Sequence, residues 1–357
     1  MLIINILTQK NENQNTISFL HPLLRHRKKF LDRQICLQFF TLIEPQIFEC
    51  DILIVSNKWR DKLGHWKNDI TALCSTAKEK GIKVIYADRS STPGSIDRFA
   101  LDICDVYTKP TFFTDLSLYD TDIHSNRLFS EHIKREFNVV DNRCVYEKPI
   151  RGPLLAAKLR PSWSVGLGNF SLLSLIFSHR VPFPFLETMS HMRYEKLTSV
   201  YSSRKLEVSC RMNIRYSQAT IEFHRRMCQK KISGYCETER VRIFRYKNEL
   251  KNAQIVISPF GTSEINYKDF EVASAGSCLV KPSISHIQTW PPLFEENVTY
   301  TPCNWNFDDL TEVVRSLLAD RDRRIYLADQ LQNRYKKYVY DETSFEYFFD
   351  LFIRTIK

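Results

Sequence analysis

The sequence has no long uninterrupted apolar run and no closely spaced cysteine pair. No run reaches the roughly 18–20 residues that a membrane-spanning helix needs, so we expect no transmembrane helix. The opening segment, MLIINILTQKNENQ, has neither a basic leader nor a small-residue cleavage site, which favours a first strand over a signal peptide. None of the ten cysteines forms a CxxC pair, so neither a disulfide framework nor a structural zinc site is expected. This cysteine usage favours the reducing cytoplasm.

Positive charge is in excess, with a formal net charge of +10 at pH 7. The excess favours an anionic partner, and it does not choose among phosphates, nucleic acid and an anionic membrane surface. Basic clusters at residues 25–29 and at Lys336-Lys337 fit a solvated face as well as a binding site. Because the aromatic and basic signatures of RNA-binding modules are missing, we expect no nucleic-acid partner.

Short apolar runs alternate with helical stretches, the pattern of parallel sheets covered on both faces. The chain of 357 residues exceeds what one compact core usually serves. We therefore predict an α/β protein with two Rossmann-like domains facing across a cleft, residues 1–160 and 161–340, followed by a C-terminal helix over 341–357. The expected strands are 2–7, 35–40, 51–56, 82–87, 103–107, 206–210, 254–258, 278–281 and 299–302, and the expected helices are 66–80, 218–229, 307–317 and 321–338.

Two further segments allow two interpretations each. The C-terminal stretch begins after Asp341, which we expect to be the N-cap of a helix. Its apolar residues at helical spacing are Phe345, Phe348, Phe349, Phe352 and Ile353. This apolar face packs on the other domain or docks on a membrane surface. The stretch RPSWSVGLGNFS, with glycines at 166 and 168, is a linker or the edge of a ligand-binding cleft.

The segment SPFGTSEINYKDFEVASAGSCLVKP, residues 258–282, has the shape of a ligand-binding turn. The strand QIVIS leads into a turn, and we expect a helix to begin near Glu264. In parallel α/β sheets, ligands bind at the carboxyl ends of strands, where helix N-termini present free N–H groups. Gly261 lets the backbone approach a ligand, and Thr262 or Ser263 caps the helix or donates to a phosphate.

Helical spacing places Glu264, Lys268, Glu271 and Ala275 on one stripe of that helix. A carboxylate on this stripe is suited to accept two vicinal hydroxyls of a ribose or hexose. The alternative is a surface helix on which Glu264 and Lys268 form an i,i+4 pair worth about 0.2–0.5 kcal/mol.

Residues 258–338 resemble the C-terminal half of the group 1 glycosyltransferases with the GT-B fold, of the type found in bacterial surface-polysaccharide synthesis. The matching positions are Phe270-Glu271, Ala275-Gly276, Lys281-Pro282, Ser285-His286, Trp290-Pro291 and Thr299-Tyr300. The resemblance implies a nucleotide-sugar donor held by the C-terminal domain, an acceptor held by the N-terminal domain, and a C-terminal helix that crosses back.

Two glutamates take roles from this resemblance. Glu271 matches the family glutamate that holds the nucleotide ribose, and Glu264 lies near the one that contacts the donor sugar. The family has seven residues between the two glutamates, whereas six separate Glu264 and Glu271. Ser263 or a backbone N–H therefore stands as an alternative to Glu264, and retention or inversion of configuration is left open.

The resemblance also implies that cationic side chains and helix dipoles, without a metal ion or other cofactor, neutralise the departing diphosphate. Arg211 and Arg215 follow the strand LEVSC, and Lys281 ends the next apolar strand, so these three are the candidates. His286 is a candidate contact to the donor sugar or base. Surface ion pairs, or a structural histidine, are the alternatives.

An inverting reaction needs a general base for the acceptor hydroxyl. Asp88, at the carboxyl end of the strand IKVIYA, is the candidate, and a capping or turn role is the alternative. His65 and Asp97 are weaker candidates. The DxD letters at residues 120–122 and 320–322, which a metal-dependent transferase would use, lack a preceding strand and are interpreted as incidental.

We therefore expect a metal-independent glycosyltransferase that moves a sugar from a nucleotide-sugar donor to a glycan or lipid-linked acceptor in surface polysaccharide synthesis. A nucleotide-sugar epimerase, or a non-catalytic nucleotide- or sugar-binding protein of the same fold, is the alternative. A cytoplasmic location is expected, with peripheral contact to the inner face of the membrane. The donor base, the sugar, the acceptor and the oligomeric state are not readable from the sequence.

Overall fold

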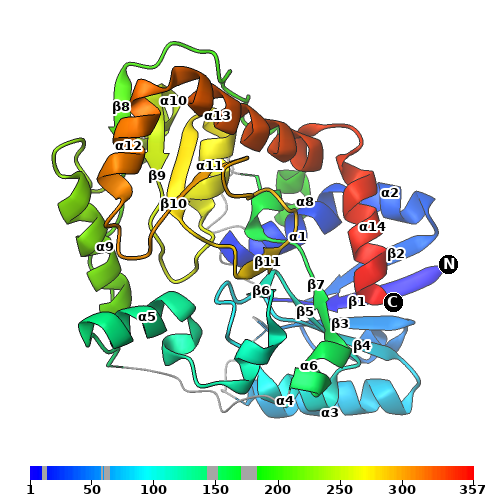
Figure 1. Ribbon diagram of the computed structural model, residues 1–357. Helices are drawn as coiled ribbons and strands as arrows, with labels where there is room; N and C mark the ends of the chain where they lie inside the picture. The colour runs from blue at the N-terminus through cyan, green and yellow to red at the C-terminus, as the bar shows by residue number, and fades with distance from the viewer. Residues whose placement is uncertain (10–13, 58, 60–64, 143–151, 170–182) are drawn as a thin grey trace.

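The computed structural model describes residues 1–9, 14–57, 59, 65–142, 152–169 and 183–357, which form two α/β domains on separate parallel sheets (Figure 1). This confirms the predicted fold class of two Rossmann-like domains. The strands of the six-stranded N-terminal sheet lie in the order β2 (Ile35–Phe40), β1 (Leu2–Leu7), β3 (Ile52–Ser56), β4 (Lys83–Ala87), β5 (Val106–Lys109) and β7 (Leu159–Pro161). The four-stranded C-terminal sheet has the order β12 (Thr301–Cys303), β10 (Cys278–Pro282), β9 (Ala253–Ile257) and β8 (Leu206–Ser209).

Both faces of the N-terminal sheet are buried. Successive residues of β3 point to opposite faces, so that Ile52 and Ile54 join one core and Leu53 and Val55 join the other. One core is shared with α3 (Trp66–Glu79), α4 (Arg98–Ile103) and α6 (Gly152–Lys158), and the other with α1 (Gln14–Arg25), α2 (Arg27–Asp32) and α5 (Leu128–Phe137). Burial on both sides explains why these strands are continuous apolar runs in the sequence.

Helices also cover both faces of the C-terminal sheet. On one face lie α9 (Ala219–Ile232) and α12 (Leu310–Ala319), and on the other α10 (Ile243–Asn252) and α11 (Tyr267–Ala275), with α13 (Arg321–Tyr335) contributing to both cores. The segment before this domain still belongs with the N-terminal domain, because α8 (Phe183–Ser190) packs on α1 and Arg25 Nη1 donates to Ser190 O at 2.7 Å. The predicted boundary at 160/161 therefore falls at β7, before the chain leaves the N-terminal domain.

Two features join the domains. β6 (Thr111–Phe113) pairs antiparallel with β11 (Ile287–Thr289), which makes a small sheet between the two halves. The helix α14 (Ser344–Ile356) crosses back onto the N-terminal domain, where it contacts β5 and β7 (Figure 1). The crossing helix predicted from the sequence is thus confirmed.

The aromatic face of α14 packs on protein. The ring centroids of Phe348 and Trp163 are 5.0 Å apart, and those of Phe352 and Phe30 are 4.9 Å apart. Phe345 is also buried, so the membrane-docking interpretation of this face is wrong for these side chains. Among the described residues, no helix has the length and apolarity needed to cross a membrane.

Some element boundaries differ from the prediction. α14 begins at Ser344 after Thr343, so Asp341 is not its N-cap. The strand predicted over residues 103–107 begins only at Val106, because α4 extends to Ile103. α13 ends at Tyr335 and continues as a π-helical turn over Lys336–Tyr340. Helix ends are set by local caps, which an apolar pattern does not show.

Candidate functional site

A cavity of about 510 Å³ lies at the carboxyl ends of β8 and β9 and at the N-terminus of α11. We call it the β9 pocket. Its size is in the range of small-ligand sites. No Asp or Glu is among the described residues that line it, whereas cationic and tyrosine side chains are abundant there. These side chains are Arg211, Arg225, Arg240 and Lys268, with Tyr216, Tyr246 and Tyr267.

The helix at the pocket begins later than the sequence predicted. Asn266 is the N-cap of α11, and its side chain forms a reciprocal capping box with Asp269, whose Oδ2 accepts from Asn266 N at 2.9 Å. Glu264 therefore stays in the preceding turn, and the helical stripe predicted through Glu264 and Lys268 is wrong at its first member. The expectation failed because Asn followed by Asp three residues later is a stronger start signal than the turn residues before it.

Lys281 fixes this turn from inside. Its side chain is fully buried, and Nζ lies 2.6 Å from Asp269 Oδ2 and 2.8 Å from Glu264 O. An ammonium group in a buried ion pair cannot move to a phosphate without leaving Asp269 uncompensated. We interpret Lys281 as a positioning residue, in place of the phosphate contact predicted from the sequence.

Glu264 is the most unusual side chain of the turn. It is fully buried, and neither carboxylate oxygen has a hydrogen-bond partner. The nearest basic group is His286 Nε2, 3.9 Å from Glu264 Oε1, and that nitrogen also lacks a partner. Burial of an unpaired carboxylate is costly, and such groups are rare outside functional sites. The surface ion pair between Glu264 and Lys268 considered from the sequence is wrong.

The turn that carries Glu264 is docked on the N-terminal domain. Thr262 O accepts from Arg127 Nε at 2.9 Å and from Thr92 Oγ1 at 3.1 Å. Ser263 Oγ donates to Ser91 O at 2.9 Å. In the structure, Thr262 and Ser263 therefore contact the loop that follows β4.

His286 is placed at the same junction by the small sheet of β6 and β11. Its carbonyl oxygen accepts from Thr114 N at 2.9 Å, and its ring centroid lies 6.3 Å from that of Phe113. Glu264 and His286, which α11 and β10 separate in the sequence, thus meet where the two domains touch.

Asp88 lies in a buried hydrogen-bond network of the N-terminal domain. Its carboxylate accepts from Asn57 Nδ2 at 2.6 Å, from Tyr107 Oη at 2.7 Å and from Lys109 Nζ at 3.1 Å. Ser90 adds donors from its backbone and its hydroxyl. A carboxylate so fully engaged is not directed at an acceptor hydroxyl, so the geometry favours the turn role over the role of general base.

Of the weaker candidates, Asp97 lies beside the Asp88 network, and the others lie elsewhere. Asp97 accepts from Tyr86 Oη at 2.8 Å, and burial together with the charge of Asp88 raises the pKa of Asp97. His65 is exposed before α3. The DxD letters fall at the end of a 3₁₀ turn near residue 120 and at the junction of α12 and α13. The described residues contain no group of three or more His, Cys, Asp or Glu side chains with metal-site geometry.

Glu271 is near the pocket through Tyr246. The hydroxyl of Tyr246, which lines the pocket, donates to Glu271 Oε2 at 2.7 Å, and Lys247 Nζ lies 2.9 Å from Glu271 Oε1. Burial, and next the charge of Glu271, raise the pKa of Tyr246 well above its usual value. A ribose hydroxyl bound by Glu271 would therefore have to displace or share one of these donors.

The two predicted arginines differ in position. Arg211 lines the β9 pocket, but its guanidinium is held by Glu249 at 2.7 and 2.9 Å and by Glu237 at 3.1 Å. The hydrogen bonds that Arg211 donates to Glu249 raise the pKa of Arg211. Arg215 is exposed and is not among the residues that line the pocket.

Two cations without an ion-pair partner among the described residues were not among the phosphate contacts predicted from the sequence. Arg225 donates to Phe260 O at 2.8 Å and to Asn213 O at 2.6 Å. Lys268 Nζ donates to Arg211 O at 2.5 Å, and burial lowers the pKa of Lys268. Arg225 could have been found from the sequence, because it is a charged residue within the apolar stripe of Ile221, Cys228 and Ile232 on α9.

Two glycines around the site pack closely against side chains. A Cβ on Gly261 would lie 2.9 Å from Arg225 Nη2, so the turn passes directly over this guanidinium. A Cβ on Gly166 would lie 2.2 Å from the ring of Phe270, which packs the loop 160–169 tightly against α11. The loop around Gly166 is thus a packed element at the domain junction.

No protein-family model matches the sequence, and no curated protein matches it. An α-glucosyltransferase in complex with UDP-glucose and DNA containing an abasic site is similar over 99% of this chain and 99% of its own, with 10% identity and a TM-score of 0.42. A glycosyltransferase from Rickettsia africae ESF-5 covers 100% and 99%, with 9% identity and a TM-score of 0.43. Sucrose-phosphate synthase from Thermosynechococcus elongatus covers 99% of each chain, with 10% identity and a TM-score of 0.43. Because these identities and TM-scores are low, we argue function from the residues of this chain.

Proposed function

We propose that this protein is a glycosyltransferase that moves a sugar from a nucleotide-sugar donor to a hydroxyl group of an acceptor. One observation carries the proposal: the buried carboxylate of Glu264 has no hydrogen-bond partner and lies at the junction of the two domains. Sugar hydroxyls are donors that satisfy such a carboxylate. The β9 pocket begins on the same turn, at Ser258 and Pro259, and supplies the positive charge that a diphosphate needs.

The donor would lie along this turn. Lys268, in the first turn of α11, and Arg225, beneath the turn, would hold the diphosphate. Glu271 would take the ribose after exchange with Tyr246 or Lys247, and Glu264 and His286 would face the sugar. Arg211, tied to two glutamates, would shape the pocket wall.

The reaction breaks the bond between the anomeric carbon and the diphosphate oxygen, and the electron pair leaves with the diphosphate. The acceptor oxygen forms the new bond to the anomeric carbon, and its proton passes to the departing diphosphate or to water. Cations fixed before the reaction stabilise the charge that develops on the leaving group. Lys268 and Arg225 are placed to do so, which supports transfer without a metal requirement.

The acceptor is proposed to be a glycan or a lipid-linked saccharide of surface polysaccharide synthesis, in a cytoplasmic protein with peripheral membrane contact. The sequence resemblance and the net charge of +10 support this finer proposal. An acceptor panel of lipid-linked saccharides, soluble glycans and duplex DNA separates it from the alternatives, since transfer to DNA alone would overturn it.

The test is a transfer assay on the full chain with a panel of nucleotide-sugars. We expect release of the nucleoside diphosphate from one donor, with a glycosylated product detected by mass spectrometry. Glu264→Gln should abolish transfer while the protein stays folded. Transfer at the wild-type rate in Glu264→Gln would reject the site, and conversion of the donor without an acceptor would indicate an epimerase.

A further inference from the structure

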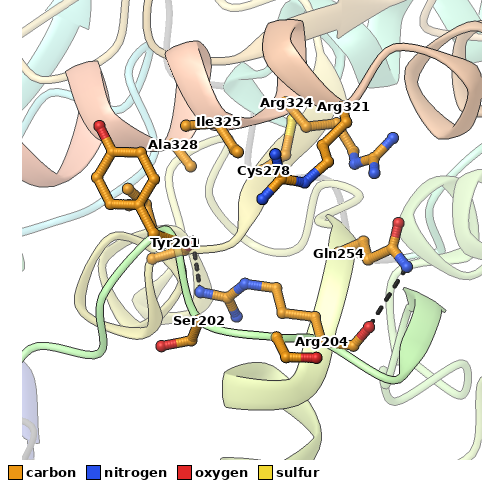
Figure 2. Close-up of a pocket in the computed structure, with 12 residues that line it drawn as sticks. Tyr201, Ser202, Arg204, Gln254, Cys278, Arg321, Arg324, Ile325 and Ala328 are labelled. Atoms are coloured by element: carbon orange, nitrogen blue, oxygen red, sulfur yellow. Dashed lines mark hydrogen bonds between the residues drawn. The ribbon is translucent and has the colours of Figure 1, made fainter.

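A second cavity, of about 330 Å³, lies at the amino ends of β9 and β10, whereas the β9 pocket lies at the carboxyl ends of β8 and β9. Figure 2 shows the residues that line this second cavity. We call it the amino-end pocket, because Gln254 at the start of β9 and Cys278 at the start of β10 form its floor. The segment 200–204 before β8 forms one wall, and the first turns of α13 form the other. None of the residues proposed for glycosyl transfer lines it.

Three arginines meet at this pocket. Arg321 and Arg324 come from α13, and Arg204 comes from the opposite wall (Figure 2). No Asp or Glu is among the described residues that line the cavity. None of the ion pairs between arginine and a carboxylate in the described part of the chain includes Arg204, Arg321 or Arg324. Positive charge is therefore concentrated at a cavity that no carboxylate of the described residues lines.

Arg204 has a structural role. Its Nη2 donates to Ala275 O at 2.8 Å and to Gly276 O at 2.6 Å, which binds the carbonyl end of α11. Its Nη1 donates to Lys251 O at 2.7 Å, and burial lowers the pKa of Arg204. These partners are neutral, so they satisfy the N–H groups and leave the charge of Arg204 uncompensated.

The other two arginines are less engaged. Arg324 donates to the carbonyl oxygens of Leu317 and Leu318 through one nitrogen, Nη1. Arg321 is exposed at the first position of α13, where the helix dipole also favours an anion. Ser202 and Ser203 add hydroxyl groups to the same cavity.

We propose that the amino-end pocket binds the phosphate group of a phosphorylated small molecule. Guanidinium groups recognise phosphate through charge-assisted, often bidentate hydrogen bonds, and the free nitrogens of Arg321 and Arg324 are suited to this. The cavity is large enough for a sugar or a similar group beside the phosphate. Tyr201, 67% exposed at the rim, offers a ring for that group to contact. This site is independent of the proposed glycosyl transfer.

The experiment is calorimetric titration of the full chain with inorganic phosphate, glycerol 3-phosphate, glucose 6-phosphate and uridine monophosphate. A parallel arm measures binding to phosphatidylcholine vesicles with and without phosphatidylglycerol, because a lipid headgroup carries the same chemistry. The test variant is Arg321→Ala. Its matched control is Arg315→Ala on α12, which removes an exposed arginine from outside the pocket. Lys268→Ala separates this pocket from the β9 pocket.

We expect at least one phosphate ester to bind wild type, Arg315→Ala and Lys268→Ala equally, and to bind Arg321→Ala about tenfold or more weakly. Binding of anionic vesicles alone, lost in the same variant, would assign the phosphate to a lipid headgroup. The proposal is overturned if no probe distinguishes Arg321→Ala from Arg315→Ala, or if all binding is lost in Lys268→Ala. Because Arg321 is exposed, an unchanged thermal midpoint should confirm that this variant folds.

Discussion

The buried Glu264 side chain should destabilise the unliganded protein, and substitution by an apolar residue should therefore raise the free energy of unfolding. Both carboxylate oxygens are buried without a hydrogen-bond partner, and leaving a buried group unsatisfied costs about 1–3 kcal/mol, more when it is charged. Met has a similar size and no polar group that needs a partner. Glu264→Met should therefore raise the free energy of unfolding by about 1–3 kcal/mol and abolish transfer.

The control is an equally buried carboxylate that is fully paired. Asp88 is 1% exposed and forms an ion pair with Lys109, which is fully buried. Asp88→Asn leaves the Lys109 charge uncompensated, and breaking such a pair costs about 3–5 kcal/mol. The two substitutions remove buried negative charge at two sites and should change stability in opposite directions.

Urea denaturation followed by circular dichroism measures both changes, and thermal midpoints give a second reading at about 2–4 °C per kcal/mol for domains of this size. A fall in stability of Glu264→Met comparable to that of Asp88→Asn would mean that Glu264 supports the fold. The interpretation of Glu264 as a ligand-binding group would then be refuted.

Three further outcomes follow from the same contacts. Lys268→Ala should weaken nucleoside diphosphate binding about tenfold in calorimetry, whereas Arg215→Ala should leave it unchanged. If Arg215→Ala weakened binding and Lys268→Ala did not, the phosphate contact predicted from the sequence at Arg215 would be restored. Lys281→Met should lower the free energy of unfolding by about 3–5 kcal/mol in urea, because it strands the buried Asp269; a neutral result would contradict the buried ion pair. Burial lowers the pKa of His224 to about 3, so the unfolded chain takes up the proton first and stability falls as pH drops from 6.5 toward 3. Between about pH 7 and about pH 4, the free energy of unfolding from urea curves should fall by about 3 kcal/mol less in His224→Phe than in the wild type. An equal fall in the two proteins would refute the lowered pKa of His224.

The central strands were predictable because they are buried on both faces, as in β3, where all five residues are buried. β1 and β2 begin and end where their apolar runs do, although Asn5 and Gln38 lie within them. The start of α11 was not, because two competing start signals lie within three residues and the capping box of Asn266 decides between them. Local propensity does not rank such signals without the tertiary contacts of the turn.

The site was predictable only in part. The turn at 259–266 was found because a strand, a glycine and hydroxyl residues precede a helix. Whether a cation is free or paired depends on residues distant in sequence, as when Arg211 meets Glu249 and Lys281 meets Asp269. The meeting of Glu264 with His286 likewise depends on how β11 pairs with the other domain.

The most direct test of the central claim is a thermal-shift panel of UDP, GDP, CMP, ADP and their sugar conjugates, with and without magnesium, on wild type and Lys268→Ala. At about 100 times its dissociation constant, a ligand should stabilise the folded protein by roughly 2.7 kcal/mol. We predict that one nucleotide raises the midpoint of the wild type without magnesium and that Lys268→Ala reduces the shift. A flat panel, or a shift that Lys268→Ala leaves unchanged, would contradict a nucleotide-sugar site in the β9 pocket.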